Sequence, residues 1–561
     1  MYTYVSIITL SGEPLIQICI HKITIMTKII TLLAVSLFIQ LGLKAQPAPI
    51  GIELESISIP NLGGVQSYAF GQHNGKWLII GGRLDGLHRR QPFAAFDVAG
   101  HNNNLVVIDP VNKQKWSAAL SSLPTGMQEQ LSATNMEFYQ SGDYLYFIGG
   151  YGYSATQRDH TTFPNLTAIK VSDVINAVVN GTSFTSYFRQ INDPKFQVTG
   201  GSLKKINDNY YLMGGQKFLG RYNPMGPTHG PGFIQEYVDG VRIFSIADDG
   251  TTILVNHLPS HDDAANLHRR DYNAEPQIMP NGEPGITMFS GVFQTTVDLP
   301  FLNCVNIDTA GYQVNNAFQQ YYNHYHCASI PLYSATNNEM HTLFFGGIAQ
   351  YYDSSGVLVQ DNDVPFVNTI ARVTRDATGK MAEYKLPIEM PALLGAGSEF
   401  IANEELPSYS NGVLKLDEIS EERILLGYIY GGISSTAANI FFTNTGTQSS
   451  ASSEIFAVYL ANYPEGVDQL NAQSAGSLDL RVYPNPSSKA FTIDFELGKK
   501  DNVKISITDI SGRLIEDILL KEQPAGKNSY HKKIRSFDKS GVYFITIESS
   551  TEKAVQKIIV E

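Results

Sequence analysis

Two short segments hold most of the side chains that could recognise or transform a ligand. The segment HRRDYNAEP supplies Arg269, Arg270 and Tyr272, and the segment NHYHCAS supplies His326. A guanidinium group suits carboxylate or sulfate because it donates two parallel hydrogen bonds, and an imidazole can hold or move a proton. We therefore predict a ligand-binding site that contains these four residues.

The elements that must position these side chains are short apolar runs that end in glycine and recur six times. Each run follows a polar turn and precedes a long polar loop and another short strand, which gives three or four strands per unit. One unit buries little apolar surface, so the units must pack against one another, and four-stranded sheets of this length close radially into a propeller. The runs are WLIIGG (77–82), YLYFIGG (144–150), YYLMGG (210–215), ITMFSGV (286–292), TLFFGG (342–347) and YIYGG (428–432).

At these runs the sequence resembles the kelch-repeat family, whose units carry an apolar strand that ends in a glycine pair. The segment VVIDPVNKQKW also keeps a version of the family's downstream Tyr and Trp positions, which the other units mostly lack. The resemblance implies an all-β fold, with a six-bladed kelch-like propeller over residues 46–462. We expect GIELESISIP (51–60) to be the outer strand of the last blade, because it would cover an edge that the ring otherwise exposes.

The loops after the glycine runs are long, whereas the turns before them are short, which favours recognition on one face. Seven of the twelve arginines between residues 46 and 479 lie in these loops or at strand entries. We predict a glycan or protein ligand on this face, with Arg158 and Tyr151 added to the site. Pairing of the arginines with nearby aspartates, which would only hold the loops, remains open. The loops are 83–103, 151–165, 216–240, 292–303, 348–368 and 433–453.

An enzyme on the same face is the alternative to a binding module. Sialic acid epimerases resemble six-bladed kelch propellers, and that resemblance implies sugar-binding arginines with an acid–base group of tuned pKa. No motif in the sequence fixes these roles, so we predict no catalytic residue. The candidates would be Arg269, Arg270, Glu275, Glu129 and His326.

A copper site is a further alternative. Galactose oxidase is a related propeller whose copper is held by histidines and tyrosines, and His324 and His326 are spaced so that both can lie on one face of a strand. The more distant ligands have no match here. We therefore predict no metal and no cofactor.

The N-terminal region has the layout of a secretory signal peptide over residues 26–45: Met26-Thr27-Lys28, the apolar run IITLLAVSLFIQLGL, and then KAQ. We expect cleavage after Ala45, and we expect residues 1–25 to be an upstream extension from a misassigned start. The apolar run is too short for a comfortable membrane span. The sequence thus predicts an exported protein without a transmembrane segment.

The C-terminal region, 480–561, changes to alternating β strands after a polar linker, 463–479, and reads as a small Ig-like β sandwich. It resembles the C-terminal sorting domain of the type IX secretion system of Gram-negative bacteria. That resemblance implies that the secretion machinery is a partner and that the protein is secreted or lies on the outer cell surface. The matching segments are VYPNPSS, ITDISGRLI, SGVYFITI and KAVQKIIV.

The charge of the chain argues against nucleic acid as a partner, and its cysteines allow a disulfide. Residues 46–479 carry 23 Lys and Arg against 41 Asp and Glu, and so acidic a body repels phosphate, which makes nucleic acid an unsuitable partner. Cys304 and Cys327 lie in the mature chain, where export permits oxidation. They are candidates for a disulfide, and two buried free thiols are the alternative.

Overall fold

The structure is a computed structural model, and it confirms the all-β prediction, with 54% strand and 7% helix. The predicted upstream extension, the signal peptide and most of the linker lie outside the described residues. No helix in the described part of the chain is both long and apolar enough to cross a membrane. The described residues are 50–561, except 231, 355–356, 420–422, 462–469, 472–477, 479, 484–486, 488–489, 510–513, 534–540, 551–552 and 561.

Six of the sheets in the described residues share one plan of four antiparallel strands. In every one, the apolar run that ends in glycine is the second strand, as predicted. The six sheets are β2 (Ala69–His73), β3 (Lys76–Ile80), β4 (Asn104–Asp109), β5 (Gln114–Ala119); β6 (Thr134–Ser141), β7 (Tyr144–Ser154), β9 (Asn165–Lys170), β10 (Phe188–Asn192); β11 (Ser202–Ile206), β12 (Asn209–Met213), β15 (Gly240–Asp248), β16 (Ile253–His257); β18 (Asn273–Ile278), β19 (Pro284–Phe289), β20 (Cys304–Asp308), β21 (Gly311–Asn315); β22 (Ser329–Ser334), β23 (Glu339–Phe345), β26 (Thr369–Arg375), β27 (Met381–Glu389); and β28 (Leu393–Ala402), β30 (Arg423–Ser435), β32 (Ile455–Ala461), β1 (Gly51–Ile57).

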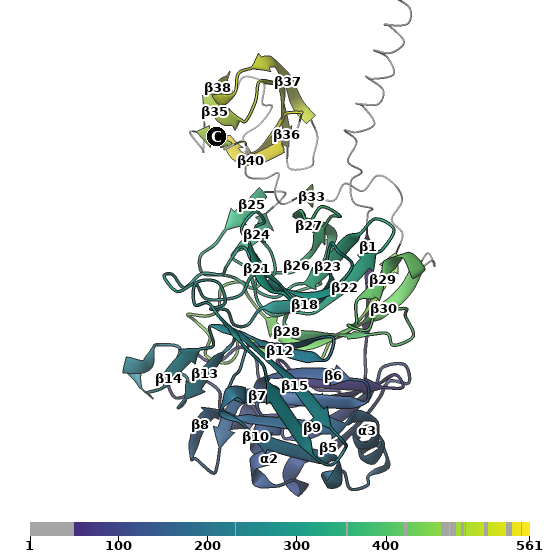
Figure 1. The fold of residues 1–561 in the computed structure, drawn as a ribbon. Coiled ribbons are helices and arrows are strands. Elements are labelled where there is room, and N and C mark those ends of the chain that lie inside the picture. The colour runs from purple at the N-terminus through teal and green to yellow at the C-terminus, as the bar shows by residue number, and fades with distance from the viewer. Residues whose placement is uncertain are drawn as a thin grey trace, which may run out of the picture. The chain divides into compact units, whose positions relative to one another are not determined.

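The remaining elements of this part extend the six sheets, cover them or, in residues 351–354 and 357–360, form a separate two-stranded sheet. Helix α3 packs Val174 and Val178, one turn apart, against the core that Leu78 and Phe147 form between the first two sheets. A hairpin of β13 and β14 extends the second sheet and projects from it (Figure 1). These elements are α2 (Thr125–Leu131), α3 (Val171–Asn180), β8 (Asp159–Thr162), β13 (Gln216–Leu219), β14 (Ile234–Tyr237), β17 (His261–Asp262), β24 (Tyr351–Ser354), β25 (Val357–Gln360), β29 (Leu414–Lys415), β31 (Ser449–Ala451) and β33 (Leu470–Asn471).

The glycine pairs are the places where one sheet bonds to the next. Gly149 and Gly150 both have left-handed backbone, with φ of 67° and 89°. The N–H of Gly150 donates to the carbonyl oxygen of Val198 at 2.9 Å, and a Cβ on Gly149 would lie only 1.9 Å from that oxygen. Only glycine permits this approach. The same bond recurs from Gly82 to Ala133, Gly215 to Arg269, Gly347 to Leu394 and Gly432 to Val65.

A closed cycle of backbone hydrogen bonds joins one residue from the entry of each sheet. Each N–H donates to the carbonyl oxygen of the residue from a neighbouring sheet, over 2.7–3.3 Å. We call these residues the hydrogen-bonded ring. In order of donation they are Ser67, Gly397, His326, Asp271, Gly200 and Asn135, which returns to Ser67.

The last sheet is completed by the first strand of the described chain. β1 pairs antiparallel with β32 from Gly51 opposite Ala461 to Ile57 opposite Ile455, which confirms the predicted outer strand. Ile52 is fully buried in the core of this sheet. The strand therefore removes an edge that would otherwise expose unpaired backbone groups.

The C-terminal region forms two further antiparallel sheets around one apolar core. The alternation read from the sequence is exact in β35, where every second side chain from Phe491 to Leu497 is buried. The strands are β34 (Arg481–Tyr483), β35 (Ala490–Leu497) and β38 (Gly526–Lys533) in one sheet, and β36 (Asp501–Asp509), β37 (Leu514–Gln523), β39 (Gly541–Glu548) and β40 (Lys553–Val560) in the other.

Candidate functional site

The loops after the six glycine runs contribute to one cavity of about 410 Å³, which we call the loop cavity. Because residues from all six loops line this one cavity, the loops converge on one face, as the sequence predicted. At its base lie five of the six members of the hydrogen-bonded ring: Ser67, Asn135, Asp271, His326 and Gly397. The loops thus form the walls, and the strand entries form the floor.

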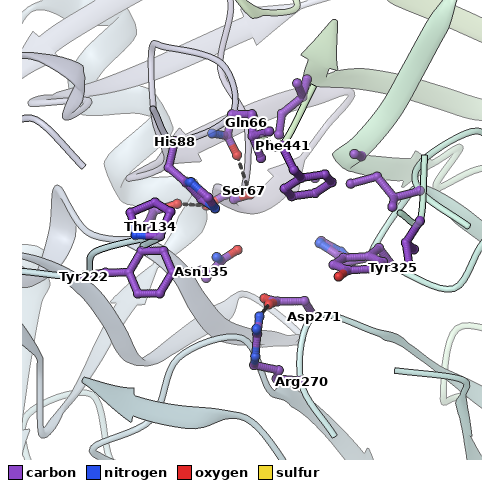
Figure 2. A pocket seen from close by; sticks show the side chains of 18 of the residues that line it. Gln66, Ser67, His88, Thr134, Asn135, Tyr222, Arg270, Asp271, Tyr325 and Phe441 are labelled. Carbon is purple, nitrogen blue, oxygen red and sulfur yellow. Dashed lines mark hydrogen bonds and ion pairs between the residues drawn. The ribbon is translucent and has the colours of Figure 1, made fainter. Parts of the chain in front are cut away.

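Aromatic side chains make up much of the wall (Figure 2). Phe96 contacts Tyr151 edge to face, with ring centroids 5.1 Å apart, and Tyr222 in the same way at 5.9 Å. The ring centroids of His88 and Tyr222 lie 5.3 Å apart. Phe441 completes this part of the lining. Ring faces of this kind suit the apolar face of a sugar or another ring.

Arg270 is one of three arginines that line the loop cavity, with Arg83, which is paired with Asp85, and Arg90. Nη1 of Arg270 pairs with Asp271, its Nε donates to the Tyr237 hydroxyl at 3.0 Å, and it lies 4.9 Å from the Phe293 ring centroid. Burial disfavours the charged form, but the adjacent Asp271 carboxylate, together with Tyr237, Tyr325 and Tyr222, more than offsets this, so the pKa of Arg270 is raised. Among the described residues its Nη2 has no hydrogen-bond partner, so one arm of the fork is available to a ligand.

Three polar groups of the lining are also unpartnered within the described chain. They are the amide of Asn135, the hydroxyl of Tyr325 and Nδ1 of the His88 imidazole, which the structure buries without a partner. Burial, helped by the Arg270 charge, lowers the pKa of His88 to about 4, so this ring is neutral at neutral pH. Figure 2 shows Asn135, Tyr325 and Arg270 around the same space.

Of the six ligand-binding residues predicted, three line the loop cavity: Arg270, Tyr151 and His326. Tyr151 has little capacity left for a ligand, because its hydroxyl donates to the Gly220 carbonyl at 2.9 Å and accepts from the Tyr222 N–H at 2.8 Å. It holds the 216–240 loop and offers only its ring.

Arg269 lies in the interior and does not line the cavity. Its guanidinium donates to the carbonyl oxygens of Asn266, Ser290 and Asn303 and lies 4.1 Å from the Phe301 ring centroid. A fully buried arginine with this set of acceptors fixes the backbone around it. Arg269 therefore holds the surrounding backbone in place and does not face a ligand in the loop cavity.

Arg158 and Tyr272 also lie outside the loop cavity. Arg158 is exposed in the turn between β7 and β8. Tyr272 is buried, and its hydroxyl donates to the Met213 carbonyl at 2.8 Å. The expected pairing of loop arginines with aspartates holds for Arg83 with Asp85 and for Arg270 with Asp271.

The candidates for acid–base and metal chemistry are dispersed. The Glu129 carboxylate accepts hydrogen bonds from the hydroxyls of Ser154 and Thr156, and Glu275 lies outside the loop cavity. Both ring nitrogens of His324 are bonded, Nε2 to the Gln320 carbonyl and Nδ1 to the Gln350 N–H. Among the described residues, no group of three or more His, Cys, Asp or Glu could hold a metal ion.

His326 keeps a carboxylate partner. Its Nε2 lies 3.1 Å from Oε1 of Glu399. Burial disfavours the protonated ring, but Glu399 outweighs it, so the pKa of His326 is raised.

The disulfide considered from the sequence is not formed. Cys304 and Cys327 are both free and buried in one small apolar cluster with Phe289 and Phe344. Burial raises the pKa of each thiol to about 12. The free thiols agree with the alternative considered from the sequence, and each sulfur contacts another side chain: Met381 for Cys304 and Asn273 for Cys327.

Sequence reasoning missed Asn135, His88, Phe293 and Phe441. A signal for the first existed, because Ser67 and Gly82, Asn135 and Gly150, and Gly200 and Gly215 share a separation of 15 residues. That spacing marks the strand entries. The other three lie in loops without any repeated spacing.

The comparisons with known proteins concern mainly the C-terminal region. Residues 481–561 match the model of the secretion system C-terminal sorting domain. A domain of this kind indicates export, with attachment at the outer cell surface or secretion, and implies interaction with the type IX secretion machinery. No curated protein matches the chain.

Solved structures give only distant likenesses. YjhT is 10% identical, with a TM-score of 0.38, and the match covers 72% of this chain and 98% of YjhT. A glycoside hydrolase family 43 arabinoxylan arabinofuranohydrolase from Bacillus subtilis is 9% identical, with a TM-score of 0.24 over 89% of this chain and 93% of that chain. Likenesses this loose decide neither fold nor activity.

Proposed function

We propose that this exported chain is a six-bladed kelch-like propeller that binds an anionic, ring-bearing ligand, such as an acidic glycan, in the loop cavity. Six four-stranded sheets, the closed hydrogen-bonded ring and the pairing of β1 with β32 support the propeller. Fold does not determine function, so the ligand must be argued from the cavity.

The observation that carries the ligand class is the free Nη2 of Arg270 within an aromatic wall. Asp271 occupies one arm of the guanidinium, which leaves the other arm to donate to a carboxylate or sulfate. Tyr222 and Phe441 offer ring surface, and Asn135 and Tyr325 offer polar groups for hydroxyls. An anionic sugar would use all three kinds of contact.

The test is calorimetric titration of the full chain with glucuronic acid and N-acetylneuraminic acid, against glucose and N-acetylmannosamine as neutral sugars. We expect the acids to bind and Arg270→Lys to weaken them at least tenfold, because lysine lacks the planar fork. Arg158→Lys, which changes an exposed arginine outside the cavity, is the matched control and should leave binding unchanged. Equal binding of acidic and neutral sugars would refute the anionic ligand.

The enzyme alternative rests on His326. This imidazole lines the loop cavity, and its Glu399 partner favours the protonated ring, as a general acid would need. The same titration distinguishes the two functions when the sugar is recovered afterwards. An anomerised, epimerised or cleaved product that His326→Gln no longer gives would establish an enzyme.

A further inference from the structure

A second cavity, of about 250 Å³, lies on the inner-strand side of the hydrogen-bonded ring, and we call it the strand cavity. The ring residues Ser67, Asn135, Asp271 and His326 line both cavities. The remaining lining of the strand cavity comes from the first strands of the sheets and the residues just before them. The ring therefore separates the two cavities.

Charged side chains from several sheets line the strand cavity, and most are paired. Lys204 Nζ lies 4.0 Å from Oε1 of Glu275. The same oxygen accepts a hydrogen bond from the Ser329 hydroxyl. His326 pairs with Glu399 at 3.1 Å. Asp271 has the Arg270 guanidinium. Each of these acids therefore has a cation beside it.

Glu137 of β6 is the acid of this lining that has no cation beside it in the described part of the chain. Its Oε1 accepts a hydrogen bond from the Gly201 N–H at 2.8 Å, whereas its Oε2 is buried without a partner. Burial raises the pKa of Glu137 to about 8, Asp271 adds to this rise, and Arg242 opposes it. An unpaired buried carboxyl either keeps a proton or attracts a cation.

The rest of the lining suits an organic cation better than a metal ion. Phe70, Phe138 and Phe400 line the cavity and are only half-buried, and the first two are in edge contact at 5.2 Å. Aromatic rings attract ammonium groups and pack against alkyl chains. No set of three or more metal-ligating side chains exists in the described residues.

We infer that the strand cavity binds a small organic ammonium ion, with its charge beside the Glu137 carboxylate and its alkyl part against the aromatic side chains. The site is distinct from the loop cavity and does not depend on what that cavity binds. Because the empty site keeps the Glu137 proton at neutral pH, binding of the cation releases this proton.

The test uses the full chain and two probes of equal size and opposite charge, butylammonium chloride and sodium butyrate, at constant ionic strength. Saturation-transfer NMR should show binding of butylammonium and no binding of butyrate. Between pH 6 and 8 the affinity should rise about tenfold per pH unit, because one proton is lost for each cation bound, and it should level off above pH 8. Binding of butyrate, or of neither probe, would overturn the proposal.

Two glutamine variants locate the site. Glu137→Gln should abolish the pH dependence and weaken butylammonium at least tenfold at pH 8.5. Glu383→Gln is the matched control, because burial also raises the pKa of Glu383 to about 8, but that carboxylate accepts from the N–H groups of Tyr321 and Tyr322 and lies outside the cavity. Equal effects of the two variants, or unchanged binding by Glu137→Gln, would contradict a cation site at Glu137.

Discussion

The backbone N–H of Ser67 donates a 2.8 Å hydrogen bond to the carbonyl oxygen of Gly397, which joins the first of the six sheets to the last. The hydrogen-bonded ring is closed at this contact by backbone atoms that no side chain can replace. The outer side of the same junction is closed differently, by the pairing of β1 with β32. The stability of the junction can therefore be measured at each place separately.

Ile52→Ala tests the outer closure. Ile52 is fully buried among Phe456, Val458 and Leu426, so its truncation should lower the free energy of unfolding by about 2–5 kcal/mol. Urea unfolding followed by circular dichroism measures this. Glu55→Ala on the same strand removes only an exposed pair with Arg423 and should cost under about 1 kcal/mol. Equal losses would show that β1 adds pairing but little burial.

Gly149→Ala tests the bond between sheets. A Cβ at this position would lie 1.9 Å from the Val198 carbonyl oxygen, so the two sheets must separate, and we expect a loss of more than about 3 kcal/mol. Gly142→Ala is matched in φ, at 61°, but its Cβ would meet nothing within 4 Å, so it should cost only about 1–2 kcal/mol. The two variants, compared by thermal unfolding, separate steric conflict from backbone strain.

Acid stability should depend on His341. Burial, with the nearby Arg372 and Arg375 charges, lowers the pKa of His341 to about 3, so the folded protein keeps this ring neutral while the unfolded chain protonates it near its ordinary pKa of 6.5. The unfolded state then binds more protons between pH 6.5 and 3, and stability falls as the pH falls through that window.

His341→Gln should flatten the acid limb, that is, the fall in the free energy of unfolding between pH 6.5 and pH 3, measured in unfolding curves at a series of pH values. The exposed His229, changed to Gln, serves as control and should leave the limb unchanged. A His341 variant whose acid limb is as steep as that of the parent would mean that other buried groups dominate.

The two thiols should be chemically silent in the folded protein. Buried thiols with a pKa of about 12 carry almost no thiolate at neutral pH, so iodoacetamide should modify neither Cys304 nor Cys327 without denaturant. In urea without reductant, both should be alkylated. Intact-mass spectrometry of the folded and denatured samples reads this directly, and resistance to alkylation in urea would instead indicate a disulfide.

Much of the architecture was predictable because it rests on local patterns. The glycine runs located the second strand of each of the six four-stranded sheets, and the segment that contains Gly51 was correctly assigned to the last of them. Alternation in residues 491–497 identified a strand with one buried face. These signals work because glycine and period-two patterns have few other physical explanations.

The site was predictable only in part, because adjacent residues of an extended segment point to opposite sides. Arg269 and Arg270 have the same chemistry, yet the first is buried among carbonyl groups and the second lines the loop cavity. His324 and His326 differ for another reason: residues 321–326 lie before β22 and outside any regular strand, so their spacing of two does not place them on one face, and His324 is held on both nitrogens by the protein. Which of two neighbouring residues faces the loop cavity depends on the register of the strand entry. Composition does not encode that register.

The pairing of β1 with β32 has a consequence for how the chain is made. Residues 51–57 leave the ribosome early, but their partners at 455–461 follow only after some four hundred residues have been added. During that interval the strand has no ladder to join, and the sixth sheet cannot be completed. Long-range closure of this kind slows folding and leaves apolar edges open to aggregation. The nascent protein is therefore at its most vulnerable just before its last sheet is finished.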